Sequence, residues 1–505
     1  MPGFTFNLAR KSAVHPAVLT ICIAIFTVIL VSLAPGPARA AAEDIRLLER
    51  SEQQQEMERL VAEQRYALAI KPAAAVLEST RQLYGNDSDE LIVPLLNLAN
   101  LQRRTGDYES ARNNYSECIT LIDQHKSILD RQLLPALVGL GDSYNYLGRH
   151  DLAALAYNRA LNVSHANEGF YNIDQINVRD GLAFSLKETG DLEKANFHME
   201  AQQYIYDYRY GENNPKVVPI LFKLAGWYGS TRQPEKQLQA YRSAFKIMER
   251  EEGKNNPDLI DALRYIAKAY LSQPAARGAD LKNLSYAPND PTALSQDQVA
   301  ALDVLNGASA ALKKAVKIAE AQEPQDTLLY SELLAELGDV YTLFAQQRTA
   351  KKYYLQAWDI LAAEENSAEL LEQFFGRPQA IGIFDLPETY PDNRDTRRAL
   401  ALSPGDFGSG SVFASFDVST SGSVKNVEVI DSNPAALVDR RVKRGLKYAR
   451  YRPVYIDREP TKVTNMVYRH DFNFDLAAME EEDDESFEPL PNPNAAPSAE
   501  TEEAG

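Results

Sequence analysis

Cysteine is scarce in this chain of 505 residues, which contains only Cys22 and Cys118. Cys22 lies inside an apolar run near the N-terminus, and Cys118 falls at a small-residue position of the repeat described below. If the N-terminal run is removed, an intrachain disulfide is impossible, which excludes a disulfide-stapled scaffold. We expect Cys118 to be buried and inert, because a free cysteine at a packing position behaves as a small hydrophobic residue.

Motifs that carry catalysis or bind cofactors are also missing. The sequence has no glycine-rich dinucleotide motif after a strand, no phosphate-binding loop, no nucleophile elbow and no cysteine pair separated by two residues. Its six histidines are scattered without the spacing of metal ligands. We therefore expect a protein that is not an enzyme and that needs no cofactor and no metal.

Basic charge is in deficit, and the deficit is concentrated at the C-terminus. The net charge is −18, and residues 480–505 contribute −10 through ten acids and no lysine or arginine, so the rest of the chain carries −8. An acidic body lacks the electrostatic footprint of a nucleic-acid-binding protein, so we expect no nucleic-acid partner. Residues 476–505 are predicted to be a disordered acidic tail.

Long apolar runs are absent except for one near the N-terminus, Ala17–Ala34. Two basic residues precede this run, and Ala38-Arg39-Ala40 after it has the small-residue pattern of a signal-peptide cleavage site. Residues 1–40 are therefore predicted to be an export signal. The 18 residues of the run are also just enough to span a bilayer, so a retained N-terminal anchor is the alternative. Both interpretations place the chain after residue 40 outside the cytoplasm.

Small residues recur at a fixed interval in the middle of the chain. Each follows a leucine or isoleucine and lies 42 residues after the one before it: Ala99, Gly141, Ala183, Ala225 and Ala267. Tyrosines and further small residues keep the same register, and glycines mark turns between the halves of each unit. Self-similarity of this length predicts a stack of helical hairpins, in which the small residues let paired helices approach.

This alternation of small and large residues resembles the tetratricopeptide repeat, in the longer 42-residue form of kinesin light chain and related bacterial arrays. The likeness concerns the repeat and implies no motor function. We expect about seven repeats over residues 44–365, with a surface loop inserted over Pro274–Ala300. Such an array buries its core between neighbouring repeats and leaves a curved face free, so the resemblance implies a protein that binds other proteins.

One second helix of the array carries four alternating tyrosines, Tyr204, Tyr206, Tyr208 and Tyr210. Residues two apart on a helix face different sides, so the four cannot all belong to the core. One interpretation packs Tyr204 and Tyr208 on the next repeat and treats the others as ordinary surface. The other makes the tyrosines an aromatic contact patch, with Tyr206 and Tyr210 as candidate partner-binding residues.

The C-terminal part of the chain has a different texture, which begins after a proline- and glycine-containing linker at residues 366–383. Alternating hydrophobic segments predict strands, and Asn433 with Pro434 is predicted to open a helix that runs to about Tyr448. The expected order is β-β-α-β-β, with strands over Ser411–Val418, Val424–Ile430, Tyr451–Ile456 and Lys462–Phe474. We therefore expect a small α+β domain at residues 384–475.

The segment Phe416–Pro453 resembles the C-terminal domain of the TonB energy transducers. The likeness rests on Phe416-Asp417-Val418, the turn residue Gly422, Val424, Asn426-Val427, Val442-Lys443 and Arg450-Tyr451-Arg452-Pro453, with Leu386–Pro391 similar to the segment that precedes that domain. The resemblance implies a domain that captures a short receptor peptide, the TonB box, as an added strand at a sheet edge. The proline-rich spacer of TonB is absent, and helical repeats occupy its place.

By position in that family, the last strand of the domain is the edge that receives the peptide. One set of alternate residues is expected to face the core: Met466, Tyr468, Phe472 and Phe474. The residues between them are candidate partner-binding residues: Val463, Asn465, Val467 and Arg469.

Basic residues crowd the predicted helix and the segment after it, where seven lie between residues 440 and 452 beside one acid, Asp439. Arg440, Arg441, Arg444 and Lys447 are therefore further candidate partner-binding residues. The ordinary interpretation is a solvated helix face. The alternative is a docking surface for an acidic group, and the acidic tail is close enough in sequence to dock in cis.

Taken together, the sequence predicts a mainly α protein, a tetratricopeptide-type solenoid followed by a small TonB-like α+β domain. The leading hypothesis is a periplasmic, non-enzymatic scaffold of a Gram-negative envelope. Its expected partners are proteins or peptides, and the resemblance extends them to outer-membrane TonB-dependent receptors. The alternative is a genuine energy transducer held at the inner membrane by its N-terminus. A third hypothesis makes the C-terminal domain a structural cap for the solenoid.

Overall fold

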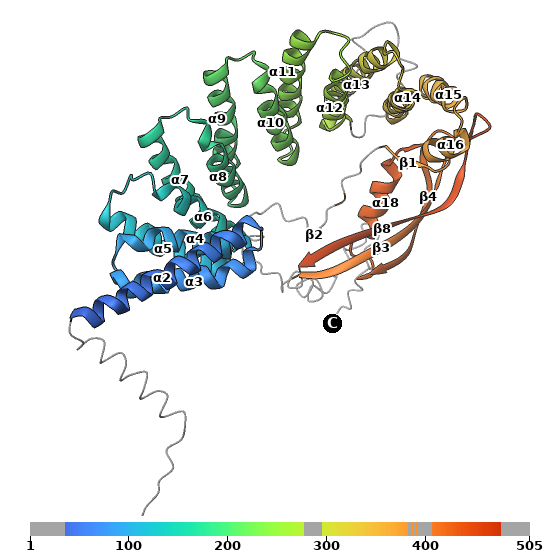
Figure 1. Ribbon diagram of the computed structural model, residues 1–505. Coiled ribbons are helices and arrows are strands. Elements are labelled where there is room, and N and C mark those ends of the chain that lie inside the picture. The colour runs from blue at the N-terminus through green and yellow to red at the C-terminus, as the bar shows by residue number, and fades with distance from the viewer. Residues whose placement is uncertain (1–35, 277–294, 382–385, 387–388, 391–406, 476–505) are drawn as a thin grey trace, which may run out of the picture. The chain divides into compact units, whose positions relative to one another are not determined.

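The computed structural model describes residues 36–276, 295–381, 386, 389–390 and 407–475 (Figure 1). The chain divides into two compact units, Met1–Glu212 and Asn213–Gly505, and each is described by itself. The apolar run Ala17–Ala34 and the acidic tail lie outside the described residues. Within the described residues, a helix of the length and hydrophobicity that a bilayer crossing requires is not found.

The first unit is built from four helix pairs, each joined by a short loop (Figure 1). The pairs are α2 (Gly36–Ala62) with α3 (Tyr66–Tyr84), α4 (Ile92–Arg104) with α5 (Tyr108–His125), α6 (Leu133–Tyr146) with α7 (His150–Glu168), and α8 (Ile176–Glu188) with α9 (Leu192–Tyr210). The 3₁₀ turns η1 (Asp89–Leu91) and η2 (Ile173–Gln175) lead into α4 and α8. Ser88 and Asn172 begin these turns, and their side chains accept hydrogen bonds from free backbone N–H groups.

The second unit continues the array with three further pairs. They are α10 (Val218–Ser230) with α11 (Pro234–Glu252), α12 (Leu259–Leu271) with α13 (Gln296–Glu320), and α14 (Thr327–Leu343) with α15 (Gln347–Leu361), and the turns η3 (Pro215–Val217) and η4 (Pro274–Ala276) precede α10 and follow α12. The described residues thus contain seven pairs, which confirms the predicted solenoid. Most of the predicted inserted loop, residues 277–294, lies outside the described residues, and α13 begins at Gln296, inside the predicted loop.

The 42-residue register marks the contact between paired helices. Ala99, Ala183 and Ala225 have no exposed surface, and a Cβ placed on Gly141 would lie 2.7 Å from Cζ of the Tyr157 ring. Only a residue without a side chain fits at Gly141 while Tyr157 keeps its place. Cys118 is buried in the same core, where burial and the nearby Glu117 carboxylate raise the pKa of its thiol to about 12. The expectation that Cys118 is buried is confirmed.

The C-terminal domain consists of a four-stranded sheet with one helix on a face. The sheet order is β2-β8-β3-β4, with β2 (Thr389–Tyr390), β3 (Phe407–Val418), β4 (Val424–Asn433) and β8 (Val463–Asp475). Helix α18 (Asp439–Tyr448) packs on this sheet through Val442 and Leu446, against Val412, Ala414 and Phe472 (Figure 1). The predicted α+β domain is confirmed.

Two details of the domain differ from the prediction. Asn433 and Pro434 do not open the helix: Asn433 ends β4 paired with Ser411, and α18 begins only at Asp439. Pairing with a neighbouring strand outweighs the local preference of proline for the first turn of a helix. The expected third strand is split into β5 (Tyr451–Arg452) and β6 (Val454–Ile456), and neither joins the main sheet.

Of the predicted linker, residues 366–383, the described part 366–381 is instead a folded connection between the array and the domain. It contains α16 (Ser367–Phe375) and β1 (Gln379–Ala380), which pairs antiparallel with β5. The sixth strand, β6, pairs with β7 (Glu459–Thr461). The C-terminal domain therefore packs on the last repeat, and the boundary between the two compact units falls inside the array, at residue 212, instead of before this domain.

Candidate partner-binding surfaces

The outer edge of β8 is the first candidate surface. On its inner side β8 pairs with β3 in an unbroken antiparallel register from Phe407↔Asp475 to Phe416↔Met466. On its outer side the described residues supply only β2, which pairs with Asn473 and Phe474. The seven residues Met466–Phe472 therefore present an edge without a neighbouring strand among the residues that the structure describes. Backbone N–H and C=O groups along such an edge can pair with an extended peptide.

The two faces of β8 follow the predicted alternation. Met466, Tyr468, Phe472 and Phe474 pack in or against the core with α18, as expected. Val467 and Arg469 point to the opposite, exposed face, where the Arg469 guanidinium pairs with Asp471 at 2.7 Å and lies 5.5 Å from the Phe413 ring. A bound strand would thus meet one charged and one apolar side chain on this face.

The beginning of β8 is irregular, and Asp417 holds it in place. The Asp417 carboxylate accepts hydrogen bonds from Lys462 Nζ at 2.8 Å, Asn426 Nδ2 at 2.7 Å and the backbone N–H of Asn465 at 3.2 Å. The hydrogen bonds of Lys462, Asn426 and Asn465 lower the pKa of this carboxyl. Asn465 adopts a left-handed φ of +58°, and Val463 is half-buried. Of the four predicted residues, Val467 and Arg469 lie on the regular edge, whereas Val463 and Asn465 precede it.

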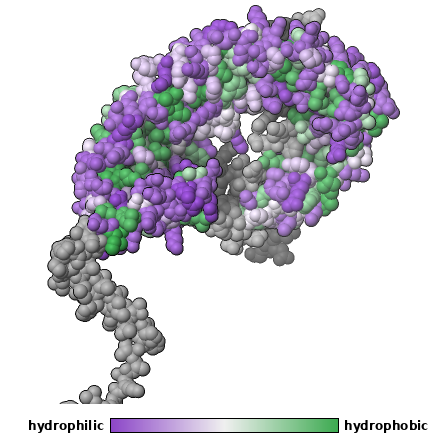
Figure 2. Space-filling view, in the orientation of Figure 1, coloured by the Kyte–Doolittle hydropathy of each residue, from purple (hydrophilic) through white to green (hydrophobic). Residues whose placement is uncertain are grey.

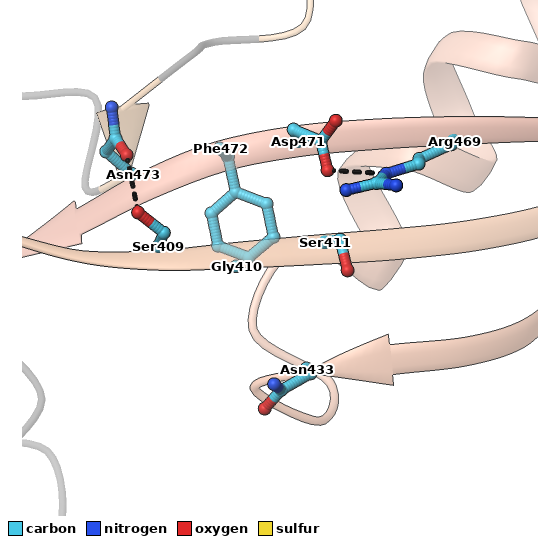
Figure 3. Close-up of a pocket in the computed structure, with 8 residues that line it drawn as sticks. All are labelled: Ser409, Gly410, Ser411, Asn433, Arg469, Asp471, Phe472 and Asn473. Carbon is cyan, nitrogen blue, oxygen red and sulfur yellow. Dashed lines mark hydrogen bonds and ion pairs between the residues drawn. The ribbon is translucent and has the colours of Figure 1, made fainter.

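A shallow depression of about 510 Å³ lies beside the far end of β8 (Figure 3). It is lined by Ser409, Gly410, Ser411, Asn433, Arg469, Asp471, Phe472 and Asn473. The Phe472 ring lies over Gly410, and a Cβ on Gly410 would approach the Asn433 carbonyl oxygen to 2.7 Å. Because Gly410 has no side chain, the end of β4 and the Phe472 ring can both lie close to this point of β3. Their approach forms the depression next to the open edge.

Helix α18 separates the predicted basic residues by face. Arg440, Arg444 and Lys447 are exposed together with Lys443, whereas Arg441 is only partly exposed. These four exposed residues have the spacing i, i+3, i+4 and i+7, which places them on one side of a helix. Val442 and Leu446 occupy the opposite side and are fully buried. We call Arg440, Lys443, Arg444 and Lys447 the basic face.

Arg452 does not belong to this basic face, although it is part of the same run of charges in the sequence. Its guanidinium is buried at the junction with the last repeat and binds Asp339 of α14 through two bonds, Nε to Oδ1 at 2.9 Å and Nη2 to Oδ2 at 2.6 Å. Burial by itself lowers the pKa of Arg452, but Asp339 outweighs it and the net shift is upward. Tyr354 donates to the same carboxylate at 2.8 Å.

Aromatic rings surround this ion pair. Tyr455 of β6 lies 5.7 Å from Tyr354 and 5.6 Å from Phe375, between ring centroids, and Trp358 lies 5.7 Å from Phe375. Lys351–Glu459 and Arg458–Asp359 add ion pairs at the solvent-exposed rim. The junction thus has an apolar and ionic centre with a charged rim, the anatomy of a specific interface.

The exposure of the four tyrosines of α9 is the reverse of what the packing interpretation expected. Tyr204 and Tyr208 are 68% and 73% exposed, whereas Tyr206 and Tyr210 are partly buried and lie 5.8 Å apart between ring centroids. Tyr208 stacks on Tyr171, with 4.3 Å between centroids. Helix α9 packs inward through Gln202 and Ile205, which are buried, whereas Tyr204 and Tyr208 lie on a different side of the helix and point outward. The visible face of the molecule is mainly hydrophilic, with smaller hydrophobic patches (Figure 2).

A polar layer inside the fourth helix pair was not foreseen. Gln175 and Arg179 of this pair are buried, and the 42-residue register reveals how unusual they are. Leucine or valine holds the first position in other repeats, at Leu91, Leu133, Val217 and Leu259, and leucine holds the second, at Leu95, Leu137, Leu221 and Leu263. Two polar residues at positions that are apolar in other repeats are a signal in the sequence, and aligning the repeats at more positions would have found it.

The polar layer is connected by hydrogen bonds but lacks a counter-charge. Arg179 Nη2 donates to Gln175 Oε1 at 3.0 Å, Arg179 Nη1 lies 3.3 Å from His198 Nδ1, and His165 Nε2 lies 3.1 Å from Gln175 Oε1. Arg179 Nε has no partner, and no described carboxylate pairs with this guanidinium. Burial lowers the pKa of Arg179, and burial followed by the charge of Arg179 lowers the pKa of His198 to about 4.

Groups of histidine, cysteine, aspartate and glutamate that could hold a metal ion do not occur among the described residues.

Three family models match the chain. The tetratricopeptide repeat matches residues 60–124 and 134–166, and the C-terminal domain of the Gram-negative bacterial TonB protein matches residues 408–476. The chain therefore carries tetratricopeptide repeats followed by a TonB C-terminal domain, as its sequence predicted.

Solved structures similar to this chain are repeat proteins at low identity. BtubC (BKLC) from P. vanneervenii is 22% identical, with 50% of this chain and 90% of that chain covered and a TM-score of 0.33. A putative kinesin light chain from Podosopora anserina is 13% identical, with 45% and 97% covered and a TM-score of 0.32. RapI in its apo form is 10% identical, with 64% and 99% covered and a TM-score of 0.34. Among curated proteins, none matches this chain.

Proposed function

We propose that this protein is a non-enzymatic scaffold of the Gram-negative periplasm, in which the helical repeats hold one protein partner and the C-terminal domain takes an extended peptide. The observation that carries the proposal is the outer edge of β8 at Met466–Phe472, where no described strand pairs. The export signal expected from residues 1–40 and the TonB C-terminal match at residues 408–476 support the location. Peptides from outer-membrane TonB-dependent receptors are the proposed occupants.

The edge of β8 suits a peptide better than the other edge of the sheet does. The register between β3 and β4 shifts twice, between Phe413 and Ala414 and between Ser415 and Asp417, and Asn426 of β4 has a left-handed φ of +51°. Such irregularities bend an edge and interrupt the row of N–H and C=O groups that a new strand needs. The β8 edge is regular over the seven residues from Met466 to Phe472, which matches the length of a short bound strand.

The test uses the full chain and a capped synthetic heptapeptide of alternating threonine and valine as the probe. Strand addition satisfies backbone groups at the edge, so hydrogen exchange should slow over Met466–Phe472 when the peptide is in excess. The matched control is the same peptide with alternate backbone nitrogens methylated, which removes half of its donors and should give no protection. Slowed exchange confined to Val424–Asn433, or equal protection by both peptides, would refute a site at β8.

A second candidate function is the energy transducer, which shares the C-terminal domain but requires a retained membrane anchor. The apolar run Ala17–Ala34 has the minimum length for that role. N-terminal sequencing of the protein isolated from a Gram-negative host separates the two candidates. A mature protein that begins at Ala41 has lost the anchor and cannot be a transducer of this kind, whereas an intact N-terminus in the membrane fraction favours the transducer.

The junction with the last repeat supports a further role for the C-terminal domain, that of a cap on the solenoid. Arg452 and Tyr455 cover Asp339, Tyr354 and Phe375, which would otherwise form an exposed end of the stack. Terminal repeats need a covering element, because their outer face has no neighbour. This role is compatible with peptide binding, since the junction uses β5 and β6 and leaves Met466–Phe472 of the β8 edge free of described strands.

A further inference from the structure

The basic face of α18 gathers four exposed positive charges on one helix of the C-terminal domain. Arg440, Lys443, Arg444 and Lys447 lie on one side of a helix of ten residues, opposite Val442 and Leu446 in the core. At 1.5 Å of rise per residue, the four side chains originate within about 11 Å along the helix axis. Four like charges at this spacing repel one another, because the screening length at 0.1 M salt is about 10 Å.

Three other basic residues of this domain pair with carboxylates, in contrast to the basic face. Arg452 binds Asp339, Lys462 binds Asp417 and Arg469 binds Asp471. None of the four residues of the basic face makes an ion pair with a described residue. The one acid of the helix, Asp439, lies off this face and its Oδ2 accepts from Ser432 Oγ at 3.4 Å. A surface of this kind is complementary to an acidic segment.

We propose that the basic face of α18 docks the acidic segment Glu480–Glu485 of the same chain. This segment consists of six consecutive acids, and it begins five residues after Asp475, the last residue of β8. Residues 480–505 contain no lysine or arginine, so no internal partner in that stretch competes for these carboxylates. Docking turns a repulsive cluster of four positive charges into an attractive contact, and it places the charged part of the tail over the domain that carries the peptide edge.

The strand register shows that the segment can reach the helix. Ser411 pairs with both Asn433 of β4 and Asp471 of β8, so these two residues lie at the same level, about 10 Å apart across two strand spacings. The contact between Ser432 and Asp439 ties the start of α18 to this level. Asp475 lies four residues further along β8, or about 13 Å.

The start of α18 is therefore about 20 Å from the end of β8 once the height of the helix above the sheet, about 10 Å, is included. An extended chain covers about 17 Å by Glu480 and about 35 Å by Glu485, at 3.3–3.6 Å per residue. The acids thus reach Arg440 first, then Lys443 and Arg444. The C-terminal end of α18 lies near the β3–β4 turn, because Tyr451 N donates to the Gly422 carbonyl, so Lys447 is reached last.

Tethering makes the contact effective although each exposed ion pair is weak. A short flexible tether gives an effective concentration on the order of millimolar, so an acidic ligand in solution must compete with the tail at that concentration. The tail then acts as an intramolecular competitor that keeps weak acidic ligands off α18. Raising the salt concentration releases it, because the screening length falls from about 10 Å at 0.1 M to about 3 Å at 1 M.

Zero-length carbodiimide crosslinking of the full chain tests the contact directly, since it joins a carboxylate to an amine only when the two touch. Mass spectrometry should find Glu480–Glu485 joined to Lys443 and Lys447 in the monomer band at low salt, and these products should disappear at about 1 M salt. The double variant Arg440→Gln with Arg444→Gln should weaken them. The matched control replaces Arg348 and Lys352, two exposed residues of α15, by glutamine and should leave them unchanged.

Equal crosslinking to Lys352, Lys425 and Lys443 would show a tail without a preferred site and would overturn the proposal. Crosslinks found only in a dimer band would assign the contact to the tail of a second copy, which also overturns docking within one chain. The substituted residues are exposed, so thermal unfolding of the variants should match that of the unmodified chain and confirm that they fold.

Competition with a labelled hexaglutamate peptide provides a second, independent test. A full chain in which the six acids Glu480–Glu485 are replaced by glutamine or asparagine should bind the peptide about 3- to 10-fold more tightly than the unmodified chain at low salt, given a millimolar effective concentration of the tail. Replacing the three distal acids Glu500, Glu502 and Glu503 by glutamine should change little. Equal affinity of both chains for hexaglutamate, or no binding to the six-fold variant, would overturn the proposal.

Discussion

At the scale of single residues, the array depends on positions that have no room for a side chain. Gly141 faces the Tyr157 ring, and Tyr157 in turn donates to Asp142 at 2.5 Å, so the ring cannot move without losing a partly buried hydrogen bond. The 42-residue spacing identified Gly141 from sequence because small residues recur there. The spacing could not show that a tyrosine fills the gap, since that contact joins two helices.

Gly141→Leu is expected to destabilise the protein by about 1–3 kcal/mol, because an added side chain overfills a packed interface. Gly226 provides the matched control, since it lies one residue after the corresponding position of α10 and a Cβ there meets no atom within 4 Å. Gly226→Leu should leave stability unchanged or raise it slightly through better helix propensity. Thermal unfolding of both variants measures the difference, and equal midpoints would argue against the assigned helix contact.

Arg179 is a charged residue at a position that is leucine in other repeats. The residue is 7% exposed, without a described carboxylate paired with its guanidinium. An uncompensated buried charge costs several kcal/mol. Arg179→Leu is therefore expected to stabilise the first unit by about 1–4 kcal/mol, measured as a higher midpoint in denaturant. The reverse change in the preceding repeat, Leu137→Arg, should destabilise it, and a lower midpoint for Arg179→Leu would show that the guanidinium has a stabilising role.

At the scale of elements, the pair α8–α9 is the part of the array that should respond to pH. The pKa of His198 is lowered to about 4 by burial and Arg179, and that of His165 is also lowered, first by burial. Both groups have an ordinary pKa near 6.5, so below that pH the unfolded chain binds more protons than the folded chain. The contribution of these two histidines to the free energy of unfolding is complete above about pH 6.5 and is lost as the pH falls toward 4.

We expect His198→Ala to weaken this pH dependence. Alanine stands at the corresponding positions Ala156 and Ala240 in neighbouring repeats, so it fits the site. Between pH 7 and pH 5 the unmodified chain should lose more stability than the variant, by on the order of 1 kcal/mol once solvent screening of the partly exposed ring is allowed for. Comparing denaturant midpoints at the two pH values isolates this contribution, because the carboxylates titrate alike in both proteins. If the midpoints of the two proteins changed equally between pH 7 and pH 5, the contribution assigned to His198 would be contradicted.

The elements of the C-terminal domain show where local signals sufficed. Alternation in β8 and the cluster of basic residues on α18 were readable from sequence, because each depends only on the period of one strand or helix. The start of α18 was misplaced by five residues, at Pro434 instead of Asp439, since cross-strand pairing of Asn433 with Ser411 lengthened β4. The outward orientation of Tyr204 and Tyr208 was also missed, because the alternation of tyrosines does not reveal which side of α9 packs inward.

At the scale of the whole molecule, the feature that matters most is the junction between the last repeat and the C-terminal domain. Arg452 and Asp339 are 113 residues apart in sequence and form a bidentate pair with side-chain exposures of 8% and 15%. Removing one partner of such a pair leaves an uncompensated buried charge. The domain is therefore coupled energetically to the array, in contrast to a domain on a flexible linker.

Asp339→Ala is expected to lower the free energy of unfolding by about 3–5 kcal/mol, because it leaves the Arg452 guanidinium buried and unpaired. The double variant Asp339→Leu with Arg452→Met should recover much of this loss, since apolar residues of similar size can replace a buried pair. Glu459→Ala at the exposed rim should cost at most about 1 kcal/mol. Chemical unfolding followed by tyrosine and tryptophan fluorescence reports on the junction, and equal losses for Asp339→Ala and the double variant would contradict the coupling.

The sequence by itself determined the repeat length, the number of helix pairs, the identity of the two domain types and the candidate edge strand. These features rest on periodicity and local pattern, which a chain expresses wherever its neighbours lie. The tertiary structure alone decided that residues 366–381 fold instead of linking, that Arg452 is an anchor instead of part of a basic surface, and that Asp417 fixes the irregular start of β8. Each of these depends on a partner far away in sequence, and the energy of a buried charge or strand edge is set by whichever residue the fold brings beside it.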